Sequence, residues 1–320
     1  MKNSIYIPLL AAGLLAVSCE KEIDFRGDEQ SPMVVVVSEP EPDTNLAVRL
    51  TYSRFFLSGT PFKVIGNADV KVVVGGTTYT GVFNDSAYIF PYSPVEGDSI
   101  ALTVRMQNGG DDTVVTASTR MPFRPSVTSK EAVGNAFHFV INDRPTEHNY
   151  YCLRLRAVDT TYEYYDADGN YVYRDDPSAV RCDTVLYTYW AQFSCSDAAL
   201  TSNVSSSIMI DGEETYDRLI FTDQLFDGQN RDVTIKSSGY GPYYYEEYKA
   251  KELDSQTYTL VLESLSREAY YYELSRYMQE NSDIFMTEPV QLQCNPLGGL
   301  GIFGAKATSI VPLGTVTNQQ

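Results

Sequence analysis

The sequence predicts an all-β protein with two β-sandwich-like domains and one helix near the C-terminus. Short segments in which apolar and polar side chains alternate recur along the chain, as in strands that bury one face. Turn residues, above all Gly, Asn and Asp, separate these segments. Helical spacing of apolar residues is clear in one segment, at about residues 266–281, where Ser266 is positioned to cap the first turn.

The first element is a predicted secretory signal over residues 1–18. Lys2 gives a basic start, residues 5–17 are almost entirely apolar, and the small Ser18 stands before Cys19. This apolar stretch is shorter than the ~20 residues that a spanning helix needs. A small residue followed by Cys resembles a bacterial lipobox, so Cys19 is the predicted site of lipidation. The alternative is an ordinary signal followed by a chance cysteine.

Residues 19–32 are rich in acidic and polar side chains and predict a flexible tether. Cleavage removes Lys2 and no acidic residue, so the net charge of −18 becomes −19. Such a chain repels phosphate backbones, which excludes nucleic acid as a partner. Contact with the membrane would come from the lipid anchor.

About 300 mature residues are more than a single hydrophobic core usually accommodates, so two domains are expected. The predicted N-terminal domain spans residues 33–122 and is a small sandwich of immunoglobulin-like or transthyretin-like type. Gly75-Gly76 marks a tight hairpin turn, and Pro122 and Pro125 mark the boundary. The expected strands lie near residues 34–37, 46–52, 70–74, 77–82, 87–91, 100–106 and 113–119.

The predicted C-terminal domain spans residues 126–320 and is again β-rich. Asp168-Gly169 is typical of a hairpin turn, and symmetrical pairing places Tyr165 opposite Val172. Residues 197–217 are polar and are expected to form a loop.

Four cysteines remain after the lipid cysteine is set aside, and they can pair in three ways in an oxidising compartment. The pairing considered first joins Cys182 to Cys195 and Cys152 to Cys294, with free buried thiols as the alternative. The cysteines form no CxxC pair and the chain has two histidines, which argues against a zinc site.

The sequence offers no catalytic, cofactor-binding or metal-binding constellation. Residues 299–304 (GLGIFG) match the dinucleotide fingerprint as a string, but they lack room for the helix and acidic residue that must follow. Structural glycines are the favoured interpretation. His138 and His148 stand in no motif that supplies a nucleophile or a zinc pair.

Tyrosine is abundant, and one cluster surrounds Gly239, Gly241 and Pro242. Such a loop offers rigid amphipathic contact surface for a peptide, a glycan or a protein partner. The alternative is an aromatic loop that covers the sandwich. The candidate contact residues are Tyr240, Tyr243, Tyr244, Tyr245 and Tyr248.

The C-terminal third carries a specific pattern, and shorter pieces upstream agree with it. The pattern comprises residues 265–272 (LSREAYYY), 288–290 (EPV), Asn295 and 298–304 (GGLGIFG); the upstream pieces are 19–24, Asp143, 149–151, 221–223 and 226–228. Together they resemble the Bacteroidota lipoprotein family known as domain of unknown function 4249. The resemblance implies an outer-membrane lipoprotein that is often encoded beside a TonB-dependent transporter.

The expected function is therefore that of a non-enzymatic, surface-exposed accessory or ligand-binding lipoprotein of such a transporter. Its location would be the outer membrane, with the domains on the cell exterior. Two alternatives stay open: a surface hydrolase that uses acidic residues, and a structural or adhesive surface protein.

Overall fold

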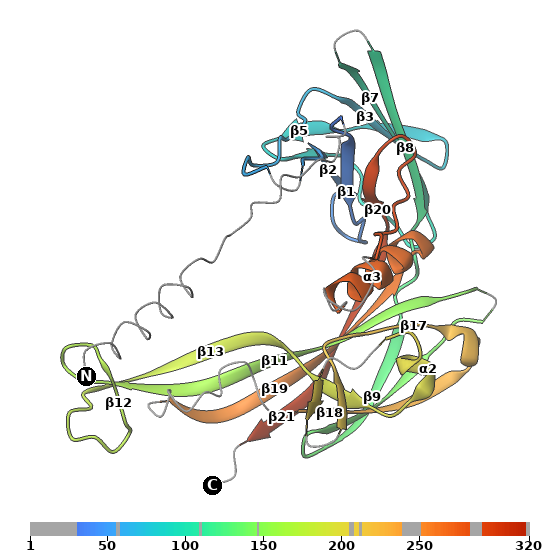
Figure 1. Cartoon of the computed structure of the whole chain (residues 1–320). Coiled ribbons are helices and arrows are strands. Elements are labelled where there is room, and N and C mark those ends of the chain that lie inside the picture. The colour runs from blue at the N-terminus through green and yellow to red at the C-terminus, as the bar shows by residue number, and fades with distance from the viewer. Residues whose placement is uncertain are drawn as a thin grey trace, which may run out of the picture.

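The computed structural model describes residues 31–55, 58–108, 111–145, 147–204, 208–210, 213–238, 251–281 and 290–317. In these ranges strands pack as sheets around two large clusters of buried apolar side chains. The prediction of an all-β, sandwich-like fold is confirmed. Figure 1 shows the N-terminal sheets on one side of helix α3 (Arg267–Glu280) and the C-terminal sheets on the other.

Two sheets enclose the N-terminal core, with strand orders β20-β1-β2-β6-β5 and β4-β3-β7-β8. Alternation buries Val48 and Leu50 and exposes Arg49, as the strand period of two requires. Gly75 and Gly76 adopt φ values of 55° and 83° and close the predicted hairpin between β3 and β4. The strands are β1 (Val34–Ser38), β2 (Ala47–Tyr52), β3 (Asp69–Val74), β4 (Thr77–Thr80), β5 (Val82–Asn84), β6 (Ala87–Ile89), β7 (Ser99–Asn108), β8 (Asp111–Arg120) and β20 (Leu300–Phe303).

The C-terminal core lies between two further sheets. One has the order β15-β16-β14-β18-β10-β9, and the other the order β12-β11-β19-β21, with β13 and β17 also paired to β11. Phe137 and Phe139 from the first sheet meet Leu153 and Leu155 from the second. The strands are β9 (Ser126–Val133), β10 (Ala136–Asn142), β11 (Tyr150–Tyr165), β12 (Tyr171–Val172), β13 (Arg181–Ala191), β14 (Phe193–Cys195), β15 (Ile208–Ile210), β16 (Glu213–Tyr216), β17 (Leu219–Thr222), β18 (Asn230–Ser237), β19 (Lys251–Leu265) and β21 (Lys306–Thr317).

Helix α3 begins after Ser266, as predicted. The Ser266 hydroxyl accepts a hydrogen bond from the Ala269 amide at 3.2 Å and satisfies a donor of the first turn. Tyr270 and Tyr277 face the sheet and pack with Cys152 of β11. Strand β11 is therefore covered on both faces near its start, by the sandwich core on one side and by α3 on the other. None of the helices in the described part of the chain is long and apolar enough to cross a membrane.

The chain returns to the N-terminal sandwich after α3, which the predicted division at residues 122–126 did not foresee. Strand β20 pairs in parallel with β1, and Phe303 is fully buried in the N-terminal core. Gly301 has a φ of 96°, and a Cβ built on it would lie 2.0 Å from the carbonyl oxygen of Val36. The glycines of residues 299–304 thus permit close packing of backbone, and strand β21 follows them where a dinucleotide site requires a helix.

The predicted register of the Asp168-Gly169 hairpin was wrong by one residue. Tyr165 lies opposite Tyr171, and Tyr164 lies opposite Val172. The Asp166 carboxylate accepts hydrogen bonds from the amides of Asp168 and Asn170, which closes a three-residue turn with Gly169 at a φ of 84°. Turn length fixes the register of a hairpin, so one added residue shifts every pair.

The expected loop over residues 197–217 contains regular structure. Asp197 caps the short helix α2 (Ala198–Thr201), and its carboxylate accepts from the Ala199 amide at 3.0 Å. Strands β15 and β16 follow and extend the sheet beyond β14. Strand β15 is short and apolar (IMI), whereas β16 (EETY) is largely polar, so neither shows a long alternating pattern in the sequence.

The close approach of β20 to β1 gives a testable expectation for stability. Gly301→Ala should lower the free energy of unfolding by about 2–5 kcal/mol, since the new methyl group clashes with the Val36 carbonyl and the backbone stays at positive φ. Gly134→Ala is the matched control because Gly134 also has positive φ but has open space around its Cβ. That variant should lose about 1–2 kcal/mol. Urea unfolding measures both values, and equal losses would contradict the packing role of Gly301.

Candidate functional site

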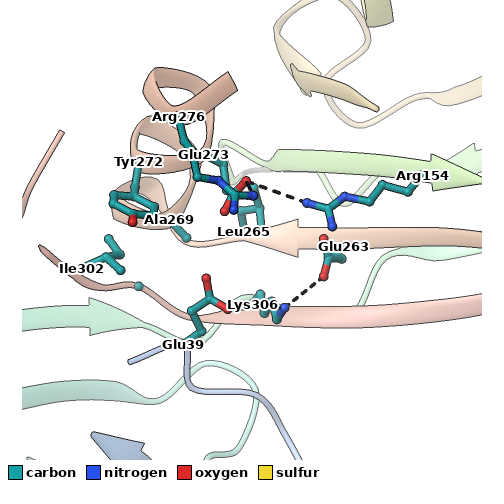
Figure 2. A pocket seen from close by; sticks show the side chains of 11 residues that line it. Glu39, Arg154, Glu263, Leu265, Ala269, Tyr272, Glu273, Arg276, Ile302 and Lys306 are labelled. Carbon is teal, nitrogen blue, oxygen red and sulfur yellow. Dashed lines mark hydrogen bonds and ion pairs between the residues drawn. The ribbon is translucent and has the colours of Figure 1, made fainter. Parts of the chain in front are cut away.

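A charged cavity of about 200 Å³ lies where helix α3, strand β20 and the sheet of β11, β19 and β21 come together (Figure 2). Its lining residues come from the β1–β2 connection, from three strands of the C-terminal sheet, and from α3 and β20. They are Glu39, Arg154, Glu263, Leu265, Ala269, Tyr272, Glu273, Arg276, Ile302, Gly304 and Lys306.

The period of each element explains how these side chains meet. On β11, Leu153 and Leu155 enter the sandwich core, so Arg154 between them points to the opposite face, on which α3 packs. Glu273 and Arg276 are three residues apart on α3 and therefore lie on one face of the helix. Figure 2 shows the Glu273 carboxylate next to Arg276, and a dashed line joins it to the guanidinium of Arg154.

Acidic and basic groups alternate around the cavity. Glu273 lies 2.7 Å from a guanidinium nitrogen of Arg276 and 3.8 Å from one of Arg154. Lys306 Nζ lies 3.2 Å from Glu263 and 3.6 Å from Glu39. Burial lowers the pKa of Lys306, but the attraction of Glu263 and Glu39 outweighs it and holds the pKa above its ordinary value. The lysine is therefore cationic in the folded protein.

Two arginines that line the cavity each have an Nε–H group without a hydrogen bond among the described residues, although Glu280 Oε1 lies 3.8 Å from that of Arg276. The Nε–H groups of Arg154 and Arg276 are buried and make no hydrogen bond. A buried donor without a partner costs about 1–3 kcal/mol, and more when the group is charged. A carboxylate is the group that guanidinium binds best in planar geometry. The cavity lining thus contains three carboxylates and three cationic side chains.

The candidate site residues named from the sequence lie elsewhere, whereas Leu265, Ala269, Tyr272, Ile302 and Gly304 of the C-terminal pattern do line the cavity. Cys19 and the tyrosine cluster at residues 240–248 lie outside the described residues. His138 is bonded to Thr234 on the surface of the sheet, and His148 is half-exposed in the β10–β11 loop. The charged residues of the cavity were missed because each is ordinary in its own segment, and only the fold brings them together from distant parts of the chain.

The predicted disulfides are not formed, because the structure has Cys152, Cys182, Cys195 and Cys294 as free cysteines. Strand β13 extends for ~30 Å between Cys182 and Ala191. The four further residues to Cys195 can return at most ~14 Å. Cys182 and Cys195 are therefore at least ~16 Å apart, whereas a disulfide tolerates at most ~7 Å between Cα atoms.

Fold and cavity together define an all-β protein with two sandwich-like halves and a charged cavity at their junction. The family model described as "Domain of unknown function (DUF4249)" matches residues 20–309, and the chain belongs to this family. No curated protein matches the sequence. Among solved structures, a DUF4785 family protein from Legionella pneumophila is 6% identical, with a TM-score of 0.20. The match covers 70% of this chain and 51% of that protein, so the chain spans about half of its length.

The free cysteines predict a simple labelling pattern. Cys182 and Cys294 are exposed and should react with a thiol reagent in the native state, whereas Cys152 and Cys195 should react after unfolding. Burial raises the pKa of Cys152 to about 12, which suppresses its reactive thiolate further. Counting reactive thiols in non-reducing buffer, on a chain without Cys19, tests this. The variant with both Cys182→Ser and Cys294→Ser should show no fast reaction, and a native wild type without fast thiols would contradict the expectation.

Proposed function

We propose that this chain is a surface-exposed lipoprotein of the outer membrane, anchored through Cys19. It acts without enzymatic activity, as an accessory or ligand-binding partner of a TonB-dependent transporter in nutrient uptake. Membership of the DUF4249 family, the lipobox-like sequence before Cys19 and the acidic tether support this proposal.

The observation that carries ligand binding is the set of partly exposed cationic side chains in the junction cavity, where Arg154, Lys306 and Arg276 are 22%, 27% and 36% exposed. Arg154 and Arg276 hold Glu273 between them and still retain a buried Nε–H group each. A ligand carboxylate would bind beside the exposed parts of these guanidinium groups, which suit a planar carboxylate. Glu39 and Glu263 both lie beside Lys306, and the carboxylates suit a ligand that also carries an amine. A short peptide has both groups, whereas a neutral glycan has neither.

The same geometry favours binding over hydrolysis. Each of Glu39, Glu263 and Glu273 lies beside a lysine or arginine, so each carboxylate is already engaged. Glycoside hydrolysis needs one carboxyl group that can donate a proton to the leaving group. The residues that line the cavity in the described chain include no Ser, Cys or His that could act as a nucleophile or general base.

Binding of a peptide carboxylate can be measured directly. Trialanine at about 1 mM should raise the Tm of the mature chain by about 2–4 °C, and trialanine amide should not, because it lacks the carboxylate. Arg276→Gln should abolish the shift. Arg49→Gln, on an exposed face of β2, is the matched control for loss of one arginine. Equal shifts with acid and amide would overturn the assignment of the carboxylate, and a shift with neutral oligosaccharides alone would overturn the assignment of a peptide.

The anchor and the partner are tested in cells that express the chain with its native signal. We expect the wild type in the outer-membrane fraction and Cys19→Ser in a soluble fraction, because removal of the thiol prevents acylation. Mild-detergent purification of the wild type should recover a β-barrel transporter. An adhesive protein would be recovered without this barrel and would affect attachment without affecting growth. An equal membrane yield of the Cys19→Ser variant would contradict the lipid anchor.

A further inference from the structure

A second group of charged residues lies at one end of the C-terminal sandwich, apart from the junction cavity. Asp143 follows β10, Asp223 opens the short 3-10 helix η1 (Asp223–Leu225) after β17, and Asp227 lies in the connection to β18. Three carboxylate oxygens, one from each residue, lie within 4.8 Å of one another. The topology brings them together because β11 joins the β10–β11 loop to β17 by direct strand pairing.

Few positively charged groups lie near these three carboxylates to offset their negative charge. Asp223 is fully buried and Asp143 is nearly so, while Asp227 is exposed. In the part of the chain that the structure describes, no lysine or arginine forms an ion pair with any of the three. His148 Nδ1 lies 3.3 Å from Asp223 Oδ1, on a side chain that is 55% exposed.

Hydrogen bonds orient the two buried carboxylates, but one of their oxygen atoms accepts no hydrogen bond. Asp143 accepts from the Tyr151 hydroxyl at 2.6 Å and from the Gly228 amide at 2.8 Å. Asp223 Oδ2 accepts from the amide and side chain of Asn149 at 2.7 and 3.0 Å. Asp223 Oδ1 is buried and has no hydrogen-bond partner. A buried carboxylate oxygen beside two other carboxylates is stabilised by a cation.

We propose that Asp143, Asp223 and Asp227 bind one calcium ion. The ligand atoms are all carboxylate oxygens, which select hard cations over zinc or copper. Calcium–oxygen distances are about 2.3–2.6 Å, so ligands on opposite sides of one ion lie about 5 Å apart, which matches the spread of these oxygens. Magnesium demands a tighter octahedron, whereas calcium accepts an irregular set of ligands completed by water at the exposed Asp227 side.

The ion would also strengthen the contact between the two halves of the molecule. The loop that follows Asp143 contacts the N-terminal half, where the Arg144 guanidinium lies 3.7 Å from the centre of the Phe123 ring. Glu147 of the same loop lies 3.3 Å from Arg120 of β8. A cation that joins Asp143 to Asp223 and Asp227 would therefore fix the loop on which these contacts depend.

Calcium binding is tested on the mature chain after removal of metal with a chelator. Titration calorimetry with calcium chloride should show one ion bound, with affinity in the range of about 0.1–1 mM that is typical of extracellular modules. Addition of about 5 mM calcium should raise the Tm by about 2–8 °C. Asp227→Asn should weaken calcium binding by more than about tenfold, because one of the three carboxylate ligands loses its charge. Asp227 is exposed, so this variant should still fold without the ion.

Asp175→Asn is the matched control, since it removes one exposed carboxylate from a different loop. It should bind calcium as the wild type does. Absence of binding at about 5 mM calcium would overturn the proposal, as would unchanged binding in Asp227→Asn. Preference for magnesium over calcium at equal concentration would overturn the choice of ion. None of these measurements depends on a ligand in the junction cavity, so the two proposals fail or stand separately.

Discussion

The parallel pairing of β20 with β1 is the contact on which the arrangement of the molecule depends. Gly301 allows it, because any side chain there would collide with the Val36 carbonyl. The strand carries Phe303 into the N-terminal core, and two residues later the Ala305 amide donates to the hydroxyls of Ser266 and Thr119, each at 3.2 Å. These bonds join the cap of α3, the end of β8 and the start of β21. The helix, and with it the junction cavity, is thereby held between the two halves.

Charge is treated differently at the two candidate sites. In the junction cavity, acidic and basic groups offset one another, and the arginine and lysine side chains stay partly exposed. At the end of the C-terminal sandwich, carboxylates gather without lysine or arginine partners among the described residues. Burial makes the unbalanced charge at this second site costly. The first site consequently suits an anionic group of a ligand, and the second suits a cation.

Much of the local structure follows from the order of the residues. The alternation in residues 46–52 and 100–106 predicts strands with one buried face, and the structure confirms them. Gly75-Gly76 and Ser266 predict a hairpin turn and a helix start, because their chemistry acts within a few residues. The register near Asp168 was missed for a reason of the same kind. The Asp166 carboxylate accepts hydrogen bonds from the amides of Asp168 and Asn170, and the turn has three residues where two were expected. Residue type alone does not reveal these hydrogen bonds.

By itself, the sequence determined the fold class, most of the strands, the cap of α3 and the structural role of the glycines in residues 299–304, because periodicity and steric freedom are local properties. Tertiary structure alone decided which strands pair and which side chains meet. Cys182 and Cys195 are close in number but are separated by an extended strand, whereas Arg154, Glu273 and Lys306 are distant in number and line one cavity. Asp143 and Asp223 likewise meet through the pairing of β11 with β17. Contacts between residues far apart in the sequence depend on long-range packing, and the residues on either side of them in the sequence do not reveal it.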